Sequence, residues 1–255
     1  GVSEGMATIT ATAEGMEAYC DVIVVNTETV FNAYNFYSGD GYNGYMVEVD
    51  TGRMDYRLLD ESPVDFVAGD YNGHDGCFYG YSDGGQFWRY DLTTGTAVKL
   101  GAPVGVNPAD MAYDYSTGLL YAVVPDVSTG LTSLCMVNLT TGQMETVYQD
   151  YFFAMTLAID LSGNIYSITN DGYLVQFVNF YDEDFGESYW YAEPLMEGLG
   201  ELQYLQSMCY DYAHDVILWD YCEASSIYWI DVNGGYVIPL GDPTGTGVFE
   251  FVGMY

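Results

Sequence analysis

A short turn motif, which recurs about every 43 to 51 residues, constrains the fold of this chain more than any other feature. Each copy has an acidic residue or Asn, then Val or Leu, two further residues and Gly, and an aromatic or apolar segment precedes it. The copies are Glu48–Gly52, Asp91–Gly95, Asn138–Gly142 and Asp231–Gly235. The last interval is double the others, which predicts a degenerate copy at Asn179–Gly186.

A second motif runs in phase with the first. It is an apolar segment ending in Asp, then a turn and a segment with an apolar–aromatic pair, and its Asp residues are Asp70, Asp114, Asp160 and Asp211. Asp caps hairpin turns, and Gly accepts the positive φ that they require. The two motifs predict four strands per repeat, for example Ala109–Tyr115, Leu119–Val124, Thr132–Leu139 and Gln143–Gln149. Four-stranded repeats of this length are typical of β-propeller blades, whereas solenoid repeats are shorter.

The two ends of the repeat region complement each other. The first unit has three expected strands, Phe31–Tyr37, Tyr45–Val49 and Arg53–Leu59, and lacks an inner strand. Val248–Tyr255 looks like an inner strand without a blade after it. We therefore predict an all-β propeller of about five blades over residues 27–255, closed by the C-terminal strand completing the first blade.

Composition excludes several classes of partner. The chain has 37 Asp and Glu against 4 Lys and Arg, a formal net charge of −33. No basic patch can form, which excludes nucleic acid, and an anionic membrane would repel the protein. No apolar run is long enough for a membrane helix, so we expect no membrane insertion. The five cysteines lack zinc-site spacing, and a Cys209–Cys222 bridge is a minor alternative to buried thiols.

The first 26 residues do not fit the repeat. Met6–Val25 alternates cleanly, turns near Glu14–Gly15, and resembles the closing hairpin of a bacterial group-2 immunoglobulin-like domain. The resemblance implies that residues 1–26 are a remnant of such a domain, and that the propeller is a monomeric module of a longer, exported bacterial surface protein. Alternatively, this hairpin belongs to the propeller. The repeats also resemble lactonase-like and quinoprotein-like propellers, which implies architecture rather than chemistry.

Catalytic and metal-binding candidates are few. His74 and His214 fall in turns of different blades, which disfavours a nucleophile–histidine triad. Asp65, Asp110 and Glu250 lie near the starts of three inner strands, where carboxylates could serve a glycoside or lactonase-type hydrolase or hold Ca²⁺. They could equally be solvated residues beside the channel. A second Ca²⁺ candidate, or else an acidic hairpin tip, contains Asp182, Asp184 and Glu187. No other cofactor is expected.

Non-catalytic binding of a glycan or a protein is the favoured function. Aromatic rings beside carboxylates suit sugar stacking or a protein hot spot, although packing between blades is the alternative for each ring. The predicted ligand-binding residues are Tyr42, Tyr45, Asp83, Asp126, Trp219, Asp220 and Tyr221. They belong to the face that carries the loops Ser38–Gly44, Asp83–Gly85, Asp126–Leu131, Asp171–Gly172 and Asp220–Ser225. The alternatives are the hydrolase and a spacer whose function lies in other domains.

Overall fold

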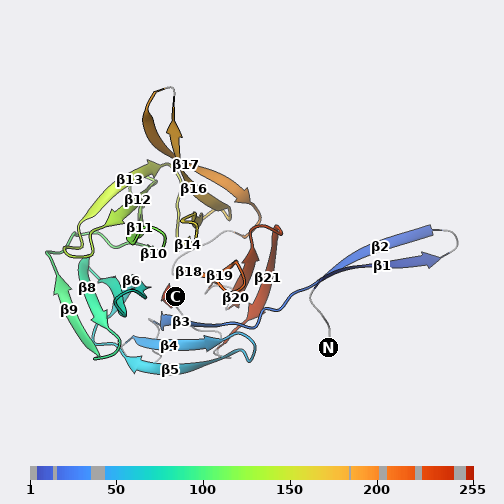
Figure 1. Cartoon of the computed structure of the whole chain (residues 1–255), viewed down its shortest axis with the longest axis horizontal. Helices are drawn as coiled ribbons and strands as arrows, with labels where there is room; N and C mark the ends of the chain where they lie inside the picture. Colours follow the sequence, from blue (N-terminus) through green and yellow to red (C-terminus); the bar gives the residue numbers. More distant parts are fainter. Residues whose placement is uncertain are drawn as a thin grey trace.

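Five four-stranded antiparallel sheets stand around a common centre as the blades of a propeller (Figure 1). This computed structural model describes residues 5–13, 16–35, 44–183, 185–200, 206–221, 226–243 and 251–255. All regular structure in these ranges is β-strand, so the predicted all-β propeller of five blades is confirmed. In the same ranges, no helix is present that could cross a membrane.

Four blades are contiguous in sequence, and the strands of each blade follow one another from the centre outward. Blade 2 contains β6 (Phe66–Asn72), β7 (Cys77–Ser82), β8 (Gln86–Asp91) and β9 (Thr96–Leu100). Blade 3 contains β10 (Asp110–Asp114), β11 (Leu119–Asp126), β12 (Leu131–Val137) and β13 (Met144–Asp150). Blade 4 contains β14 (Ala158–Ile159), β15 (Ile165–Ile168), β16 (Leu174–Asp182) and β17 (Glu187–Met196). Blade 5 contains β18 (Gln206–Asp211), β19 (Val216–Tyr221), β20 (Ser226–Asp231) and β21 (Tyr236–Gly241).

Blade 1 joins the two ends of the propeller chain. It contains β22 (Phe251–Met254), β3 (Val30–Asn35), β4 (Tyr45–Asp50) and β5 (Asp55–Glu61), in that spatial order. Asn32 and Tyr255 exchange two backbone hydrogen bonds, with N···O distances of 2.8 and 2.7 Å. This pairing confirms the predicted composite blade, and it gives β3 a partner strand on each side.

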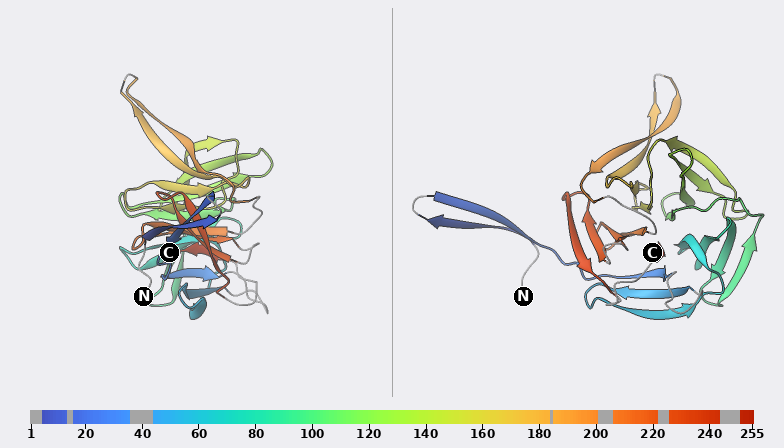
Figure 2. Two further views of the ribbon diagram at one scale, coloured as in Figure 1. Left: turned by 90° about the vertical axis from the view of Figure 1, so that its right-hand side faces the viewer. Right: turned by 180° about the vertical axis from the view of Figure 1, so that it is seen from behind.

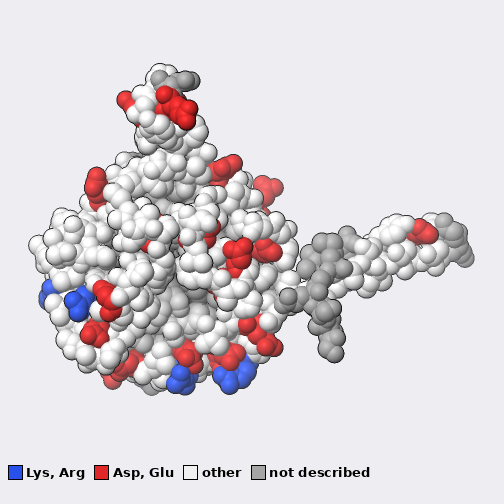
Figure 3. Space-filling model, in the orientation of Figure 1, with Lys and Arg blue, Asp and Glu red and all other residues white. Residues whose placement is uncertain are grey.

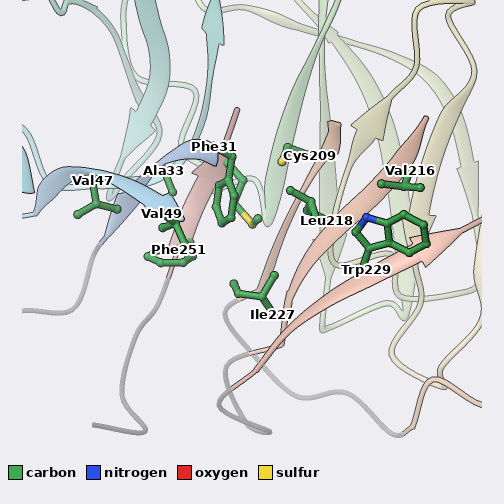
Figure 4. Packing of buried hydrophobic residues seen from close by; sticks show 11 residues of the cluster. Phe31, Ala33, Val47, Val49, Cys209, Val216, Leu218, Ile227, Trp229 and Phe251 are labelled. Atoms are coloured by element: carbon green, nitrogen blue, oxygen red, sulfur yellow. The ribbon is translucent and has the colours of Figure 1, made fainter. Parts of the chain in front are cut away.

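The hydrophobic core consists of five clusters, one between each pair of neighbouring blades. The cluster at the closure joins blades 1 and 5, where Phe31 and Phe251 face Leu218 and Trp229 (Figure 4). Trp88, Trp190 and Trp229 pack between blades: Trp229 is a buried member of one cluster, and Trp88 and Trp190 are partly buried against two others. Burying such apolar faces stabilises the ring by about 25 cal/mol per Å².

The recurring turn motif caps the hairpin between the third and fourth strands of a blade. Asp91 Oδ1 accepts hydrogen bonds from the backbone N–H groups of Thr93 and Thr94, and Gly95 adopts a φ of +65°. Blade 1 departs from this pattern, because its cap is Asp50 and the residue four positions later is Met54, with a φ of +49°. The motif copy expected at Glu48–Gly52 is therefore displaced by two residues.

Met54 holds a left-handed backbone conformation in which a side chain is strained, so Met54→Gly is expected to stabilise the protein. The expected gain in unfolding free energy is about 1 kcal/mol, measured by urea unfolding. Gly95→Ala, at the matching position of blade 2, should destabilise by a similar amount. Equal unfolding midpoints for Met54→Gly and the wild type would show that this turn carries no strain.

The turn after each inner strand is capped in the same way. Asp114, Asp160 and Asp211 each accept a hydrogen bond from the backbone N–H two residues later. In blade 2 this cap is Asn72, which accepts from the backbone N–H of His74 at 2.9 Å. Asp70, which the sequence pattern aligned with the caps, instead lies two residues earlier, inside the ring.

Two hairpins project from the ring (Figure 2). One contains β1 (Gly5–Ala13) and β2 (Met16–Val24), which form a two-stranded sheet of their own. Its assignment to an immunoglobulin-like domain stays a prediction. The other is the outer end of β16 and β17, where Phe180 faces Tyr189 across the strands.

Candidate functional site

The five inner strands end around a cavity of about 660 Å³ at one mouth of the central channel. Its wall includes tyrosines from blades 1, 2, 3 and 5, while blade 4 supplies Ala158, Ile159 and Leu161. We call this cavity the tyrosine pocket, after Tyr71, Tyr113, Tyr115, Tyr210, Tyr212 and Tyr255. Its volume suits a small organic ligand.

The tyrosines lie at the pocket because they flank the caps of the inner-strand turns. Tyr113 and Tyr115 stand on either side of Asp114, and Tyr210 and Tyr212 stand on either side of Asp211. The rings also contact one another between blades: Tyr115 meets Tyr212 edge to face, with 5.8 Å between ring centroids. Such contacts hold the rings in fixed positions, which reduces the entropy that ligand binding must overcome.

Half of these tyrosine hydroxyls are already committed to the protein. The Tyr115 hydroxyl donates to the carbonyl of Tyr71, the Tyr212 hydroxyl to the carbonyl of Ile159, and the Tyr210 hydroxyl to Asp215. The hydroxyls of Tyr71, Tyr113 and Tyr255 have no hydrogen-bond partner within the described part of the chain. These three hydroxyls are left for water or for a ligand that reaches them.

Asp70 is the buried acid of the pocket wall, with an exposed fraction of 9%. Its Oδ1 accepts from the backbone N–H of Tyr71 at 2.7 Å, and its Oδ2 accepts from the backbone N–H of Tyr113 at 2.6 Å. Burial raises the pKa of Asp70 to about 7, although these two hydrogen bonds act in the opposite direction. Burial and the charge of Asp70 raise the pKa of Tyr115 to about 12, so this phenol stays protonated at neutral pH.

The Asp70 carboxyl group loses its proton near pH 4 in the unfolded chain but only near pH 7 in the folded protein. Between these two pH values the unfolded state is favoured increasingly as pH rises, so Asp70 makes the unfolding free energy fall. The expected slope is up to about 1.4 kcal/mol per pH unit. Asp70→Asn should remove this contribution, so its unfolding free energy relative to wild type should rise with pH across the window. Urea unfolding of both proteins at several pH values measures the difference, and parallel curves would contradict the expectation.

The two histidines lie beside the pocket, in the turns that follow the inner strands of blades 2 and 5. His214 Nδ1 is 2.7 Å from Asp211 Oδ2, and the His74 ring contacts those of Tyr113 and Tyr115. Burial would raise the pKa of Asp211, but hydrogen bonds from His214 and from the Ala213 backbone hold it below the usual value. Asp211 therefore adds a second negative charge to the pocket wall.

Asp110, a predicted catalytic candidate, is fully buried deeper in the channel. Its Oδ2 accepts from the backbone N–H groups of Leu157, at 2.8 Å, and Met208, at 3.1 Å, and its Oδ1 accepts from the Ser207 hydroxyl. Ser207 Oγ in turn accepts from the backbone N–H groups of Gly253 and Met254. This network joins blades 1, 3, 4 and 5 across the axis, so it gives Asp110 a structural role.

Two of the three catalytic candidates have different environments in the described part of the chain. Asp65 is exposed ahead of β6, in contrast to the buried Asp110, and Glu250 lies outside the described residues. A catalytic role for these acids stays a prediction.

The predicted ligand-binding residues have differing environments. Trp219 and Asp220 are buried: the indole donates to Gln206, and Asp220 Oδ2 accepts from the Phe251 backbone N–H at 2.9 Å. Tyr221 stacks on Trp219, and Tyr45 packs against the cluster between blades 1 and 5. Asp83 and Asp126 are exposed turn residues, and Tyr42 lies outside the described residues. Trp219 is packed inside the protein, which is the alternative given above for each aromatic ring. Ligand binding by this set of residues stays a prediction.

A Ca²⁺ site stays a prediction. Within the described ranges, no three His, Cys, Asp or Glu side chains gather around one point. Asp182 and Glu187 face each other across β16 and β17, and Asp184 lies outside those ranges. Cys209 is a free, buried thiol opposite Leu218, so the alternative of a Cys209–Cys222 bridge is wrong, and the predicted buried thiol is confirmed at this position.

The sequence does carry a signal for the tyrosine pocket. Two inner-strand ends read Tyr-Asp-Tyr, at residues 113–115 and 210–212, and the blade 2 equivalent begins Tyr71-Asn72. An alternation of tyrosine with a turn cap places rings on both sides of the turn, at a mouth where inner strands converge. These tyrosines are not among the predicted ligand-binding residues, which belong to loops on the other face of the ring.

Comparison with solved structures finds similar propellers at low sequence identity. A chain in a nidogen/laminin complex has a TM-score of 0.51 and 10% identity, with 88% of this chain and 96% of that chain covered. TolB from Acinetobacter baumannii has a TM-score of 0.52 and 14% identity, with 84% of this chain and 52% of that chain covered. A Bacteroides thetaiotaomicron protein of unknown function has a TM-score of 0.50 and 12% identity, with coverages of 81% and 55%.

The likeness is one of fold. This chain spans about half the length of the latter two proteins. No protein-family model and no curated protein matches the sequence. The chain is therefore a propeller module, and its ligand has to be argued from the pocket.

Proposed function

We propose that this protein is a non-catalytic ligand-binding propeller, and that a small ligand such as a glycan occupies the tyrosine pocket. The observation that carries the proposal is a cavity of about 660 Å³ lined by fixed tyrosine rings, three of whose hydroxyls have no partner in the described chain. Aromatic rings stack on sugar faces, and phenol hydroxyls bond sugar hydroxyls.

The concave site favours a small ligand over a flat protein surface, because it encloses the bound group. The described acids support binding rather than hydrolysis, since Asp110 is bonded to three donors of the protein itself. Export to a bacterial surface belongs to the same proposal and rests on the immunoglobulin-like resemblance of residues 6–25.

A glycan array followed by calorimetry tests the proposal. Tyr71→Phe and Tyr113→Phe each remove one available hydroxyl and keep the ring, so each should weaken binding about five- to tenfold. Tyr151→Phe is the matched control, because Tyr151 is 78% exposed and does not line the pocket, and its affinity should equal that of wild type.

The alternative face provides the contradicting outcome. Binding that survives both pocket variants but is lost in Tyr42→Ala or Tyr221→Ala would place the ligand at the loops predicted from sequence. A protein that binds no glycan or other small ligand would overturn the proposal.

A further inference from the structure

The wall of the tyrosine pocket is acidic and contains no Lys or Arg among its described residues. The four cations of the chain lie in the outer half of blades 1 and 2: Arg53 in the turn between β4 and β5, Arg57 on β5, Arg89 on β8 and Lys99 on β9. Figure 3 shows basic side chains near the rim of the visible face, while acidic groups are spread over it. Such a pocket disfavours anions, which leaves neutral and cationic ligands.

At one level of the pocket, blade 2 differs from blades 3, 4 and 5 because it carries Asp70. The residue two positions before the inner-strand cap is Asp70 in blade 2, but Ala112, Ala158 and Cys209 in blades 3, 4 and 5. All four of these residues line the pocket. One carboxylate therefore stands among small, uncharged side chains, which leaves space for a ligand group beside it.

The carboxylate of Asp70 is held in place but retains bonding capacity. Each oxygen accepts one backbone hydrogen bond, from Tyr71 or from Tyr113, and keeps a further lone pair. An ionised carboxylate only accepts hydrogen bonds, so its ligand partner must be a donor or a cation. A buried charge is costly without a counter-charge, and no described Lys or Arg of the wall supplies one.

From this arrangement we infer that the tyrosine pocket recognises an organic ammonium group, held between the Asp70 carboxylate and the surrounding tyrosine rings. An ammonium forms strong charge-assisted contacts with a carboxylate and is attracted to aromatic faces. The net charge of −33 also raises the local concentration of cations. The inference rests on the proposed function and narrows its ligand to amines, either an amino sugar or a quaternary amine.

Charged probes and their uncharged analogues test the inference on the wild-type protein by calorimetry. Choline is compared with 3,3-dimethylbutan-1-ol, which has the same shape without the charge, and a glucosamine disaccharide is compared with its N-acetylated form. At least one charged member should bind about tenfold more tightly than its neutral analogue. The pair that responds distinguishes a quaternary amine from an amino sugar.

Asp70→Asn should reduce the affinity of that charged probe to about the level of its neutral analogue. Glu145→Gln changes the net charge by the same amount at an exposed position of the outer strand β13, outside the pocket, and it should leave the affinity unchanged. Circular dichroism and a thermal midpoint check that Asp70→Asn remains folded, and the comparison of analogues on wild type stands without any variant.

Equal affinities for charged and neutral probes, or no binding of either charged probe, would overturn the inference. If the glycan array then still yields a neutral glycan whose binding depends on Tyr71 and Tyr113, the proposed function stands and only the inference of an ammonium ligand fails. If no ligand depends on these tyrosines, both proposals fail.

Discussion

A chain that lacks residues 251–255 is expected to lose the cooperative unfolding of the ring. The deletion removes Phe251, Val252 and Met254, all at most 1% exposed, and each buried side chain of this kind contributes about 1.5–3 kcal/mol. The sum is comparable with the whole stability of a typical domain, about 5–15 kcal/mol. The deletion also leaves the backbone of β3 and the buried Asp220 without their partners on β22 and Tyr255.

Removal of residues 1–24 is the matched control at the other end of the chain. The β1–β2 hairpin pairs only with itself among the described strands, so the thermal midpoint of the ring should shift by no more than about 2 °C. Differential scanning calorimetry compares both deletions with the full chain. A peptide containing residues 244–255, added in trans, should restore part of the lost transition. Unchanged unfolding after removal of residues 251–255 would show that β22 does not close the ring.

Asp110→Ala is expected to cost about 3–5 kcal/mol of unfolding free energy, measured by chemical denaturation. The change leaves the N–H groups of Leu157 and Met208 buried without their acceptor and releases the Ser207 hydroxyl that bonds β22. Because the carboxyl group touches three blades besides its own through this network, the loss should lower the stability of the entire ring.

Two further variants separate this network from a general effect of charge. Asp110→Asn keeps one oxygen acceptor and nearly the same volume, so it should lose less than half as much stability. Asp126→Ala removes an exposed cap whose carboxylate bonds only its own turn, and it should cost about 1 kcal/mol or less. Similar losses for Asp110→Ala and Asp126→Ala would contradict a network across the axis.

The blade architecture could be predicted from the sequence because turn chemistry repeats. Asp91, Asn138 and Asp231 cap equivalent hairpins, and the period between them reports one four-stranded blade. The closure was predictable for a related reason, since a three-stranded unit at Phe31 and a lone strand ending at Tyr255 are complementary. Two copies of the turn motifs lie two residues away from their expected positions. Met54 occupies the turn position where the pattern expects Gly, and Asn72 occupies the cap position where it expects Asp.

The pocket could not be predicted with equal success, because its residues come from strand ends in five blades. Local sequence shows that Tyr113 and Tyr210 flank a cap, but only the ring brings them to one cavity with Tyr255. The error at Asp70 has the same origin: an Asp near a strand end resembles a cap. Its burial and its bond to Tyr113 of the next blade depend on tertiary structure.

The composite blade also determines the order in which the ring can fold. Blades 2 to 5 each form from a continuous segment, whereas β3 must wait for a strand about 200 residues later in the chain. The entropy of closing so long a loop grows only slowly with its length, so the equilibrium penalty is modest. The rate is affected more, because the inner edge of β3 stays exposed throughout synthesis of the other four blades. A nascent chain therefore carries an open β-edge on β3 until β22 has been synthesised, and the ring can close only then.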